Sequence, residues 1–349
     1  MSLHCRQRAN CLLLALTVCA GVGPPLAGCA GNGGLGKISG RNPRHELASK
    51  QNELHPVSDQ YSTSSTAPAA AAIASSPLGP VLQAPPALQK LVDIVRPKPR
   101  NDRDWVPELK ELAQAEFQDN QVKIHNVRNA EFYTYHDCVV RYYDKTYDLT
   151  KIKTVDFIVI PFNNNKSIAH TMLSFGFSDG EQVGISAEVR LEKGQQYNVA
   201  LGLAGQFELI YVIADERDLI RARTEHRNVD VYLYRTTATP DQARKLFVNM
   251  LQRANQLRDT PEFYDTLRNN CTTNIVRHID AIAPGRVPLY DYRVILPGYS
   301  AELAYELGLI DNSLPFAEVT RRARINEAAL KYRDDPHFSA RIRGEKAIR

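Results

Sequence analysis

The sequence predicts an α+β fold in which a mostly antiparallel sheet packs against helices. Two observations indicate this class. Short apolar runs typical of strands follow one another between residues 121 and 234, whereas amphipathic helical patterns dominate after Pro240. Strands grouped first and helices later favour α+β over a doubly wound α/β arrangement, in which the two alternate along the chain.

The expected elements follow in chain order. A helix is expected from Asp104 to about Phe117. Strand-like runs lie at 121–127, 132–135, 138–143, 155–161, 169–177, 183–191, 207–213 and 229–234. Thr239-Pro240-Asp241-Gln242 is a capping box with proline at the first helical position, so a helix should begin there. A second helix is expected after Cys271, and short helices from Ala301 onward.

Residues 1–28 have the pattern of a lipoprotein signal peptide. Arg6 and Arg8 precede an apolar run, Cys11 to Val22, which is too short to span a bilayer stably. Leu26-Ala27-Gly28-Cys29 then resembles the lipobox of bacterial lipoproteins, whose cysteine is thioether-linked to diacylglycerol. A plain cleaved signal and an uncleaved anchor are the alternatives. Ala30 after the cysteine favours sorting to the outer membrane.

Residues 29–100 are rich in Gly, Ser, Ala and Pro and lack periodicity, so we expect a disordered tether behind a lipid anchor at Cys29. The bacterial membrane is therefore an expected partner. A periplasm-facing domain is expected at 101–312 and a helical basic extension at 313–349, which either touches anionic lipid or is a solvated helix. The net charge of +4, without a basic stripe carrying interleaved aromatics, argues against nucleic acid.

Loss of the signal and lipidation of Cys29 would leave two thiols, Cys138 and Cys271. In an oxidising periplasm they could form one disulfide, or remain one structural and one reactive thiol. Cys138 has no metal-ligand spacing to a second cysteine, and we expect neither a metal nor another cofactor. The charged run Asp215-Glu216-Arg217-Asp218 is expected to be a salt-bridged surface turn that starts a helix, with headgroup docking as the alternative.

Cys271 lies where a helix is expected to start. The apolar residues that recur after it at helical spacing are Ile275, Val276, Ile279 and Ile282. Asn269 or Asn270 can cap this helix, and a thiol in the first turn feels the positive end of the helix dipole, which lowers its pKa. The alternative is a small buried apolar residue. His278 would be about 10 Å further along the axis and is not expected to take part.

The runs 169–177 and 183–191 are expected to form a hairpin whose register can be derived. The odd-numbered residues of both runs are mostly apolar, so they must share the core face, and odd must pair with odd. A two-residue Asp-Gly loop would put the two apolar sets on opposite faces. A three-residue loop, Ser178-Asp179-Gly180 with the glycine in the left-handed region, pairs Phe177 with Glu181 and satisfies the pattern.

This register places His170 directly across from Glu188, with Cβ atoms roughly 5 Å apart. Such a pair is also explained by a salt bridge on a solvated face. With a cysteine at a helix start, however, it makes the constellation of a thiol acyl-transfer enzyme: Cys271 as nucleophile, His170 as base and Glu188 to orient the imidazole. Ser174 and Ser186 continue the same face of the hairpin.

Four segments resemble the Lnb N-terminal periplasmic domain family, an exported bacterial domain. They are Ala169–Phe175, Ile185–Arg190, Tyr211–Ile220 and Phe263–Thr273, within a resemblance that runs from about 104 to 309. The most specific part is Asn270-Cys271-Thr272-Thr273. The order of histidine first and Asn-Cys later is also similar to permuted papain-like thiol enzymes of the NlpC/P60 type.

The resemblance implies a permuted papain-like architecture and thiol-dependent acyl transfer, with Cys271 matching the family nucleophile and His170 its base. In the family, an acyl chain moves from the glycerol of a lipoprotein to its N-terminal amine. This sequence shows no multi-spanning membrane region, so the chemistry is expected to carry over more readily than the substrate. Backbone N–H groups at the helix start would hold the oxyanion. The residues expected to form the substrate or oxyanion region are Asn270, Thr272, Ser174 and Ser186.

Two functions stay open at this point. One is a lipid-anchored cysteine acyltransferase or hydrolase that acts on an acylated lipid or lipoprotein. The other is a non-catalytic envelope lipoprotein that binds lipid, peptidoglycan or an assembly partner.

Overall fold

The computed structural model describes residues 98–133, 138–162, 165–227 and 229–345. The predicted signal peptide, Cys29 and almost all of the predicted tether lie outside these residues, so the predictions of lipidation and tethering stay predictions.

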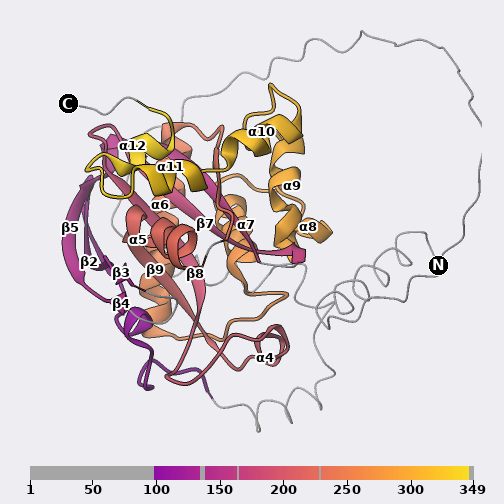
Figure 1. Cartoon of the computed structure of the whole chain (residues 1–349). Helices are drawn as coiled ribbons and strands as arrows, with labels where there is room; N and C mark the ends of the chain where they lie inside the picture. The colour runs from indigo at the N-terminus through magenta and orange to yellow at the C-terminus, as the bar shows by residue number, and fades with distance from the viewer. Residues whose placement is uncertain (1–97, 134–137, 163–164, 228, 346–349) are drawn as a thin grey trace, which may run out of the picture. The chain divides into compact units, whose positions relative to one another are not determined.

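In the described part of the chain, eight strands form one mixed sheet in the order β1-β2-β9-β8-β7-β6-β10, and β5 also pairs with β2 (Figure 1). The β2–β9 pairing is parallel, and the other pairings of this sheet are antiparallel. The strands are β1 (Gln114–Gln118), β2 (Gln121–Arg128), β5 (Tyr142–Asp148), β6 (Ile152–Phe162), β7 (Asn165–Phe177), β8 (Gln182–Arg190), β9 (Glu208–Asp215) and β10 (Tyr232–Arg235). The predicted α+β class is confirmed, with a mixed sheet.

The remaining elements are short except for two helices. A small ribbon pairs β3 (Glu131–Phe132) with β4 (Cys138–Val139). The α-helices are α4 (Val199–Leu203), α5 (Glu216–Arg221), α6 (Pro240–Asp259), α7 (Cys271–Ile282), α8 (Tyr292–Ile295), α9 (Ser300–Glu306), α10 (Phe316–Ala323), α11 (Asn326–Lys331) and α12 (Phe338–Ile342). The 3₁₀ turns are η1 (Pro107–Leu109), η2 (Leu149–Lys151) and η4 (Pro297–Tyr299), and η3 (Ala222–His226) is a π-helical turn.

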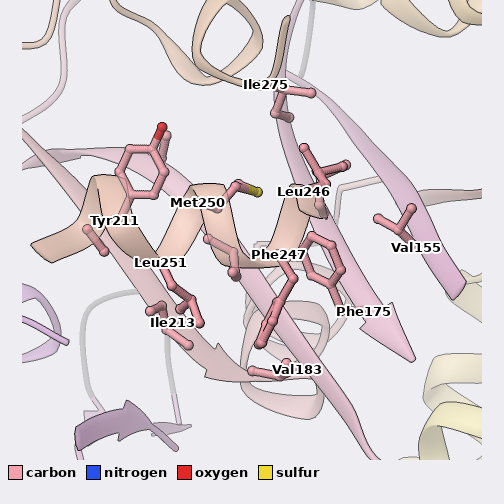
Figure 2. Close-up of a cluster of buried hydrophobic side chains, with 14 of the residues drawn as sticks. Val155, Phe175, Val183, Tyr211, Ile213, Leu246, Phe247, Met250, Leu251 and Ile275 are labelled. Carbon is pink, nitrogen blue, oxygen red and sulfur yellow. The ribbon is translucent and has the colours of Figure 1, made fainter. Parts of the chain in front are cut away.

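The central strands are buried on both faces, which explains their nearly continuous apolar sequences. Odd-numbered residues of β9, such as Tyr211 and Ile213, belong to one apolar cluster, and Ile210 and Val212 belong to another on the opposite face. Helix α6 covers the first face, where Phe247 packs against the sheet (Figure 2). Helices α5, α11 and α12 supply side chains to the second cluster. The sheet is therefore a middle layer between helices.

The predicted hairpin register is confirmed over the residues that pair. The N–H of Phe177 donates to the carbonyl of Glu181 at 3.0 Å, and Gly180 has a φ of 87°. Phe175 lies opposite Val183 and Leu173 opposite Ile185. The odd-numbered apolar residues of both strands lie in the cluster that faces α6, as the alternation requires.

The predicted helix from Asp104 to Phe117 is wrong. Only the 3₁₀ turn η1 forms, and residues 114–118 are the strand β1, paired along its length with β2. Residues 114–118 form a tight hairpin with β2, in which Gln118 lies opposite Gln121 and the turn residue Asp119 has a φ of 52°. Pairing with the adjacent strand thus overrides local helix propensity.

The C-terminal basic segment forms the helices α10, α11 and α12, and it is not a solvated appendage. Phe338 and Ile342 of α12 are buried in the second apolar cluster. Arg343 follows them, and its buried guanidinium lies 2.8 Å from Asp156 and 2.8 Å from Glu216. The segment therefore closes the second face of the sheet.

The charged run at 215–218 is likewise buried where a surface turn was expected. Asp215 does cap α5, since its side chain accepts from the N–H of Arg217 at 2.9 Å. Glu216 and Asp218 are only 1% and 2% exposed. Asp218 accepts two hydrogen bonds from Arg128, at 2.9 and 2.8 Å, so the run carries buried ion pairs.

We expect Arg343→Ala to destabilise the fold by about 3–5 kcal/mol, because it leaves the buried Glu216 without its cation and removes one of the two cations, Arg343 and Arg235, that pair with the buried Asp156. Arg341→Ala is the matched control: this arginine is 41% exposed in its ion pair with Asp335, so its loss should cost less than about 1 kcal/mol. Urea unfolding of both variants measures the difference. Equal, small effects would show that Arg343 does not stabilise the sheet.

Candidate active site

Cys271 is the first residue of α7, as predicted, and Asn270 is the cap. The Asn270 side chain accepts from the N–H of Thr273 at 2.8 Å, while the Thr273 hydroxyl accepts from the N–H of Asn270 at 2.9 Å. This capping box fixes the first turn of the helix. Asn269 instead donates to the carbonyl of Phe263 at 2.9 Å and holds the preceding loop.

The site forms where β7 and β8 separate. These strands pair from Gly176–Gln182 to Leu173–Ile185, and beyond that β7 stays paired with β6 while β8 stays paired with β9. The first turn of α7 lies against β7 at this opening. The hydroxyls of Thr272 and Thr171 are 2.9 Å apart, and the Cys271 sulfur is 4.0 Å from the carbonyl oxygen of Ala169. A helix start is thus docked beside a gap in the sheet.

His170, Ser186 and Glu188 meet in this opening. The Nε2 atom of His170 is 2.6 Å from the Ser186 hydroxyl, which donates to Oε1 of Glu188 at 2.8 Å. The direct separation of Nε2 and Oε1 is 3.5 Å. The derived register therefore brings imidazole and carboxylate together, and Ser186 bridges them. Sequence reasoning placed Ser186 with the substrate region and missed this bridge.

The Cys271 thiol is 3% exposed, and the imidazole of His170 is close enough to act on its pKa. Burial alone would raise its pKa, but the hydrogen bond and the positive charge of His170, with a further hydrogen bond from Thr171, lower the pKa of Cys271 to about 7. Cys271 is a free thiol, so the alternative of a disulfide with Cys138 does not occur here. A thiol with this pKa is substantially ionised at neutral pH.

The pKa values of His170 and Glu188 shift in the directions that favour an ion pair. Burial lowers the pKa of His170, but hydrogen bonds with Cys271 and Glu188 outweigh it and leave this pKa raised. Burial raises the pKa of Glu188, but the hydrogen bond with His170 and the charge of Arg223 hold it well below its usual range. Thiolate and carboxylate therefore each stabilise the imidazolium, and the thiol and imidazole titrate as a coupled pair.

Arg223 and Tyr264 are further residues of this site that sequence reasoning did not single out. Arg223 lies in the π-helical turn η3, a kind of turn often found at functional sites, and is 3.0 Å from Oε1 of Glu188. The Tyr264 hydroxyl is hydrogen-bonded to the backbone of Cys271, and burial followed by the charge of the thiolate raises its pKa well above the usual value. Arg223 and Glu188 are 35 residues apart in the chain, so no local pattern indicates their contact, whereas Tyr264 is only seven residues before Cys271.

Other predicted residues lie elsewhere or have different partners. Ser174 is not joined to the thiol but donates to the buried carboxylate of Glu216. Asn270 uses its amide in the cap and in a hydrogen bond to the Thr266 carbonyl at 2.6 Å, so its side chain is occupied. The hydroxyl oxygen of Thr272 lies 3.8 Å from the Cys271 sulfur.

His278 is a structural residue, in agreement with the expectation from helical spacing. Its Nε2 is 2.7 Å from the Tyr211 hydroxyl and its Nδ1 is 2.6 Å from the side-chain oxygen of Asn249. Burial, with the nearby cations Arg253 and Arg277, lowers the pKa of His278 to about 3, so it stays neutral.

One known protein family matches the part of the chain that carries this site. Residues 139–298 match the Lnb N-terminal periplasmic domain family. The matched Lnb region contains His170, Glu188 and Cys271, and it indicates a periplasmic protein of the cell envelope. No curated protein and no solved structure matches the chain.

Two further observations concern only the residues that the structure describes. None of their helices combines the length and apolar character needed to cross a membrane. No cluster of three or more His, Cys, Asp or Glu side chains among them is arranged to hold a metal ion.

We expect alkylation of Cys271 by iodoacetamide to rise with pH through a midpoint near 7, because only the thiolate reacts and its pKa is lowered to about 7. His170→Gln removes the stabilising charge, so the midpoint should move up and the rate at pH 7 should fall roughly tenfold or more. Mass spectrometry of the Cys271 peptide measures the rate, with the Cys138 peptide of the same digest as internal reference. An unchanged midpoint in His170→Gln would contradict the ion pair.

Proposed function

We propose that this protein is a lipid-anchored periplasmic thiol enzyme that transfers or hydrolyses an acyl group. The observation that supports this most strongly is that His170, which lowers the pKa of the Cys271 thiol at the start of α7, is linked through Ser186 to Glu188. A nucleophile, a base within reach and a group that orients the base are the requirements of covalent acyl transfer.

In the proposed reaction the Cys271 thiolate attacks the carbonyl carbon of an acyl ester. The carbonyl oxygen takes up the negative charge and is held by backbone N–H groups at the start of α7, with the Tyr264 hydroxyl nearby. His170 donates its proton to the departing alkoxide, and the C–O bond breaks to leave an acyl thioester on the sulfur. Water or an amine then attacks the thioester, His170 accepts the proton, and the thiolate is released.

The ring nitrogens of His170 have separate roles in this proposal. Nε2 faces Ser186 and Glu188, which leaves Nδ1 as the nitrogen for proton exchange at the thiol. Histidine on a strand before the cysteine helix is also the order of permuted papain-like enzymes, and we include that architecture in the proposal. The ionised Glu188, held by Arg223, stabilises the imidazolium during both half-reactions.

An acylated lipid or lipoprotein of the envelope is the proposed substrate. It is supported by the match to the Lnb N-terminal periplasmic domain family and by the predicted anchor at Cys29, which would hold the site near acyl chains in the outer membrane. A second candidate is an envelope module that binds lipid, peptidoglycan or an assembly partner without chemistry. The 3% exposure of Cys271 favours it, because a nucleophile must be reached by its substrate.

We expect Cys271→Ala to abolish acyl-thioester formation with a p-nitrophenyl ester while leaving the thermal unfolding midpoint within a few degrees of the parent. Intact-mass measurement of the full chain detects the thioester, and Cys138→Ala is the matched control, which should still be acylated. Absence of any adduct in the parent chain, together with full genetic complementation by Cys271→Ala, would favour the non-catalytic candidate.

We expect Ser186→Ala to lower kcat roughly tenfold, because a hydrogen bond to a charged group contributes about 1.5–3 kcal/mol. Against the effect of burial, Cys271 and Glu188 raise the pKa of His170, so loss of the Ser186 bridge to Glu188 should lower this pKa and shift the basic limb of kcat/KM to lower pH. A less stable imidazolium also raises the pKa of Cys271, which moves the acid limb to higher pH. The bell-shaped profile should therefore narrow. A lower rate with an unchanged profile would mean that Ser186 has only a structural role.

A further inference from the structure

A cavity of about 310 Å³ runs beside α7 and begins next to the candidate nucleophile. Thr272, whose hydroxyl oxygen is 3.8 Å from the Cys271 sulfur, lines its buried end. The α7 residues on its wall are Thr272, Ile275, Val276, Ile279 and Ile282, which form one face of the helix, followed by Ala283. From Thr272 to Ala283 the helical rise is about 16 Å, so the cavity is long as well as large.

The apolar lining of this space comes from two clusters of side chains. Ile275, Leu246 and Ile310 belong to the cluster under the sheet. Val276, Val294, Leu303 and Val287 belong to a second cluster, and Ile279 and Leu309 pack against both. Apolar cavities of about 150 Å³ already take up small hydrocarbons, and unfilled space of this kind costs stability in proportion to its volume. An apolar cavity of about 310 Å³ therefore points to a space kept for a ligand.

The polar groups on the wall are bonded within the protein. The hydroxyls of Thr236 and Thr237 donate to the carbonyls of Val155 and Gly308 at 2.7 and 2.8 Å, and that of Ser300 donates to Pro297 at 2.6 Å. Thr272 shares a hydrogen bond with Thr171. Arg293 is held by Asp291 and Glu306, at 2.8 and 2.7 Å. An occupant would find few polar partners along the wall, so it must be apolar along its length.

We propose that this cavity receives the hydrocarbon chain of the acyl group while its carbonyl carbon lies at the Cys271 sulfur. The proposal rests on the proposed function for the position of the carbonyl, but the cavity's affinity for an acyl chain can be measured without chemistry. Thr237, Gln242 and Arg286 are the exposed residues of the wall and place the outlet away from the buried end at Thr272. A chain longer than the cavity therefore extends toward solvent, and selectivity rises with chain length to a plateau.

Direct binding tests the cavity independently of catalysis. The full chain carrying Cys271→Ala, with Cys29→Ser to avoid lipidation and detergent, is titrated with the fluorescent fatty acid cis-parinaric acid. Saturable binding is expected, and Val276→Phe, which fills the cavity from α7, should weaken it at least tenfold. Ala304→Phe fills the cavity from α9 and provides a second blocked variant in case one misfolds, and unfolding midpoints are measured for both. Ala281→Phe, exposed on α7 and outside the cavity, should bind like the parent.

Equal binding by parent and blocked variants, or no binding by the parent, would overturn the proposal. Acylation of Cys271 by p-nitrophenyl acetate, octanoate and laurate tests the reaction separately in the chain that retains the thiol. The ratio of the laurate to the acetate rate should fall in Val276→Phe and stay constant in Ala281→Phe. Acylation by the acetate ester without fatty-acid binding would contradict the acyl-chain site and still support the enzyme. Fatty-acid binding that the blocked variants weaken, without acylation of Cys271, would contradict the enzyme and still support the acyl-chain site.

Discussion

The chemistry of this molecule depends on one contact, between the thiol at the start of α7 and the imidazole on β7. The contact exists because β7 and β8 stop pairing after Leu173 and Ile185, which opens the sheet where the helix start is docked. In a continuous sheet, His170 and Glu188 would be a cross-strand pair turned away from α7. The opening lets a residue of the strand reach a residue of the helix, and the Thr171–Thr272 hydrogen bond fixes their approach.

A layer of buried charge on the other face of the sheet supports this contact. Glu188 can remain ionised inside the protein because Arg223 lies beside it, with Arg128 and Asp218 as the next ion pair. Removal of one partner from such a network leaves an uncompensated charge, so its members stabilise one another's positions. The C-terminal segment takes part through Arg343, which joins Asp156 and Glu216. The basic extension is thus a structural part of the fold that carries the site.

Local sequence patterns predicted a substantial part of this arrangement. The alternation of apolar residues was sufficient to derive the hairpin register and to bring His170 near Glu188, and the Asn270 cap followed from residue type and helical spacing. The bridge through Ser186 was missed, because it depends on the separation of two strands. The helix expected from Asp104 was wrong because residues 114–118 form a tight hairpin with β2, and the turn at Asp119 and Asn120 was not recognised. The position of Arg223 and the cavity beside α7 arise from tertiary packing, which no single segment encodes.

The most direct measurement of the central claim is the pKa of His170, followed by NMR titration of its ring in the parent chain and in Cys271→Ala. The account predicts that the parent imidazole titrates above its ordinary value because thiolate and carboxylate stabilise its charge. Removal of the sulfur takes away the first of these partners, so the pKa should fall in the variant. A His170 pKa that is the same with and without Cys271 would contradict the ion pair and, with it, the enzymatic account.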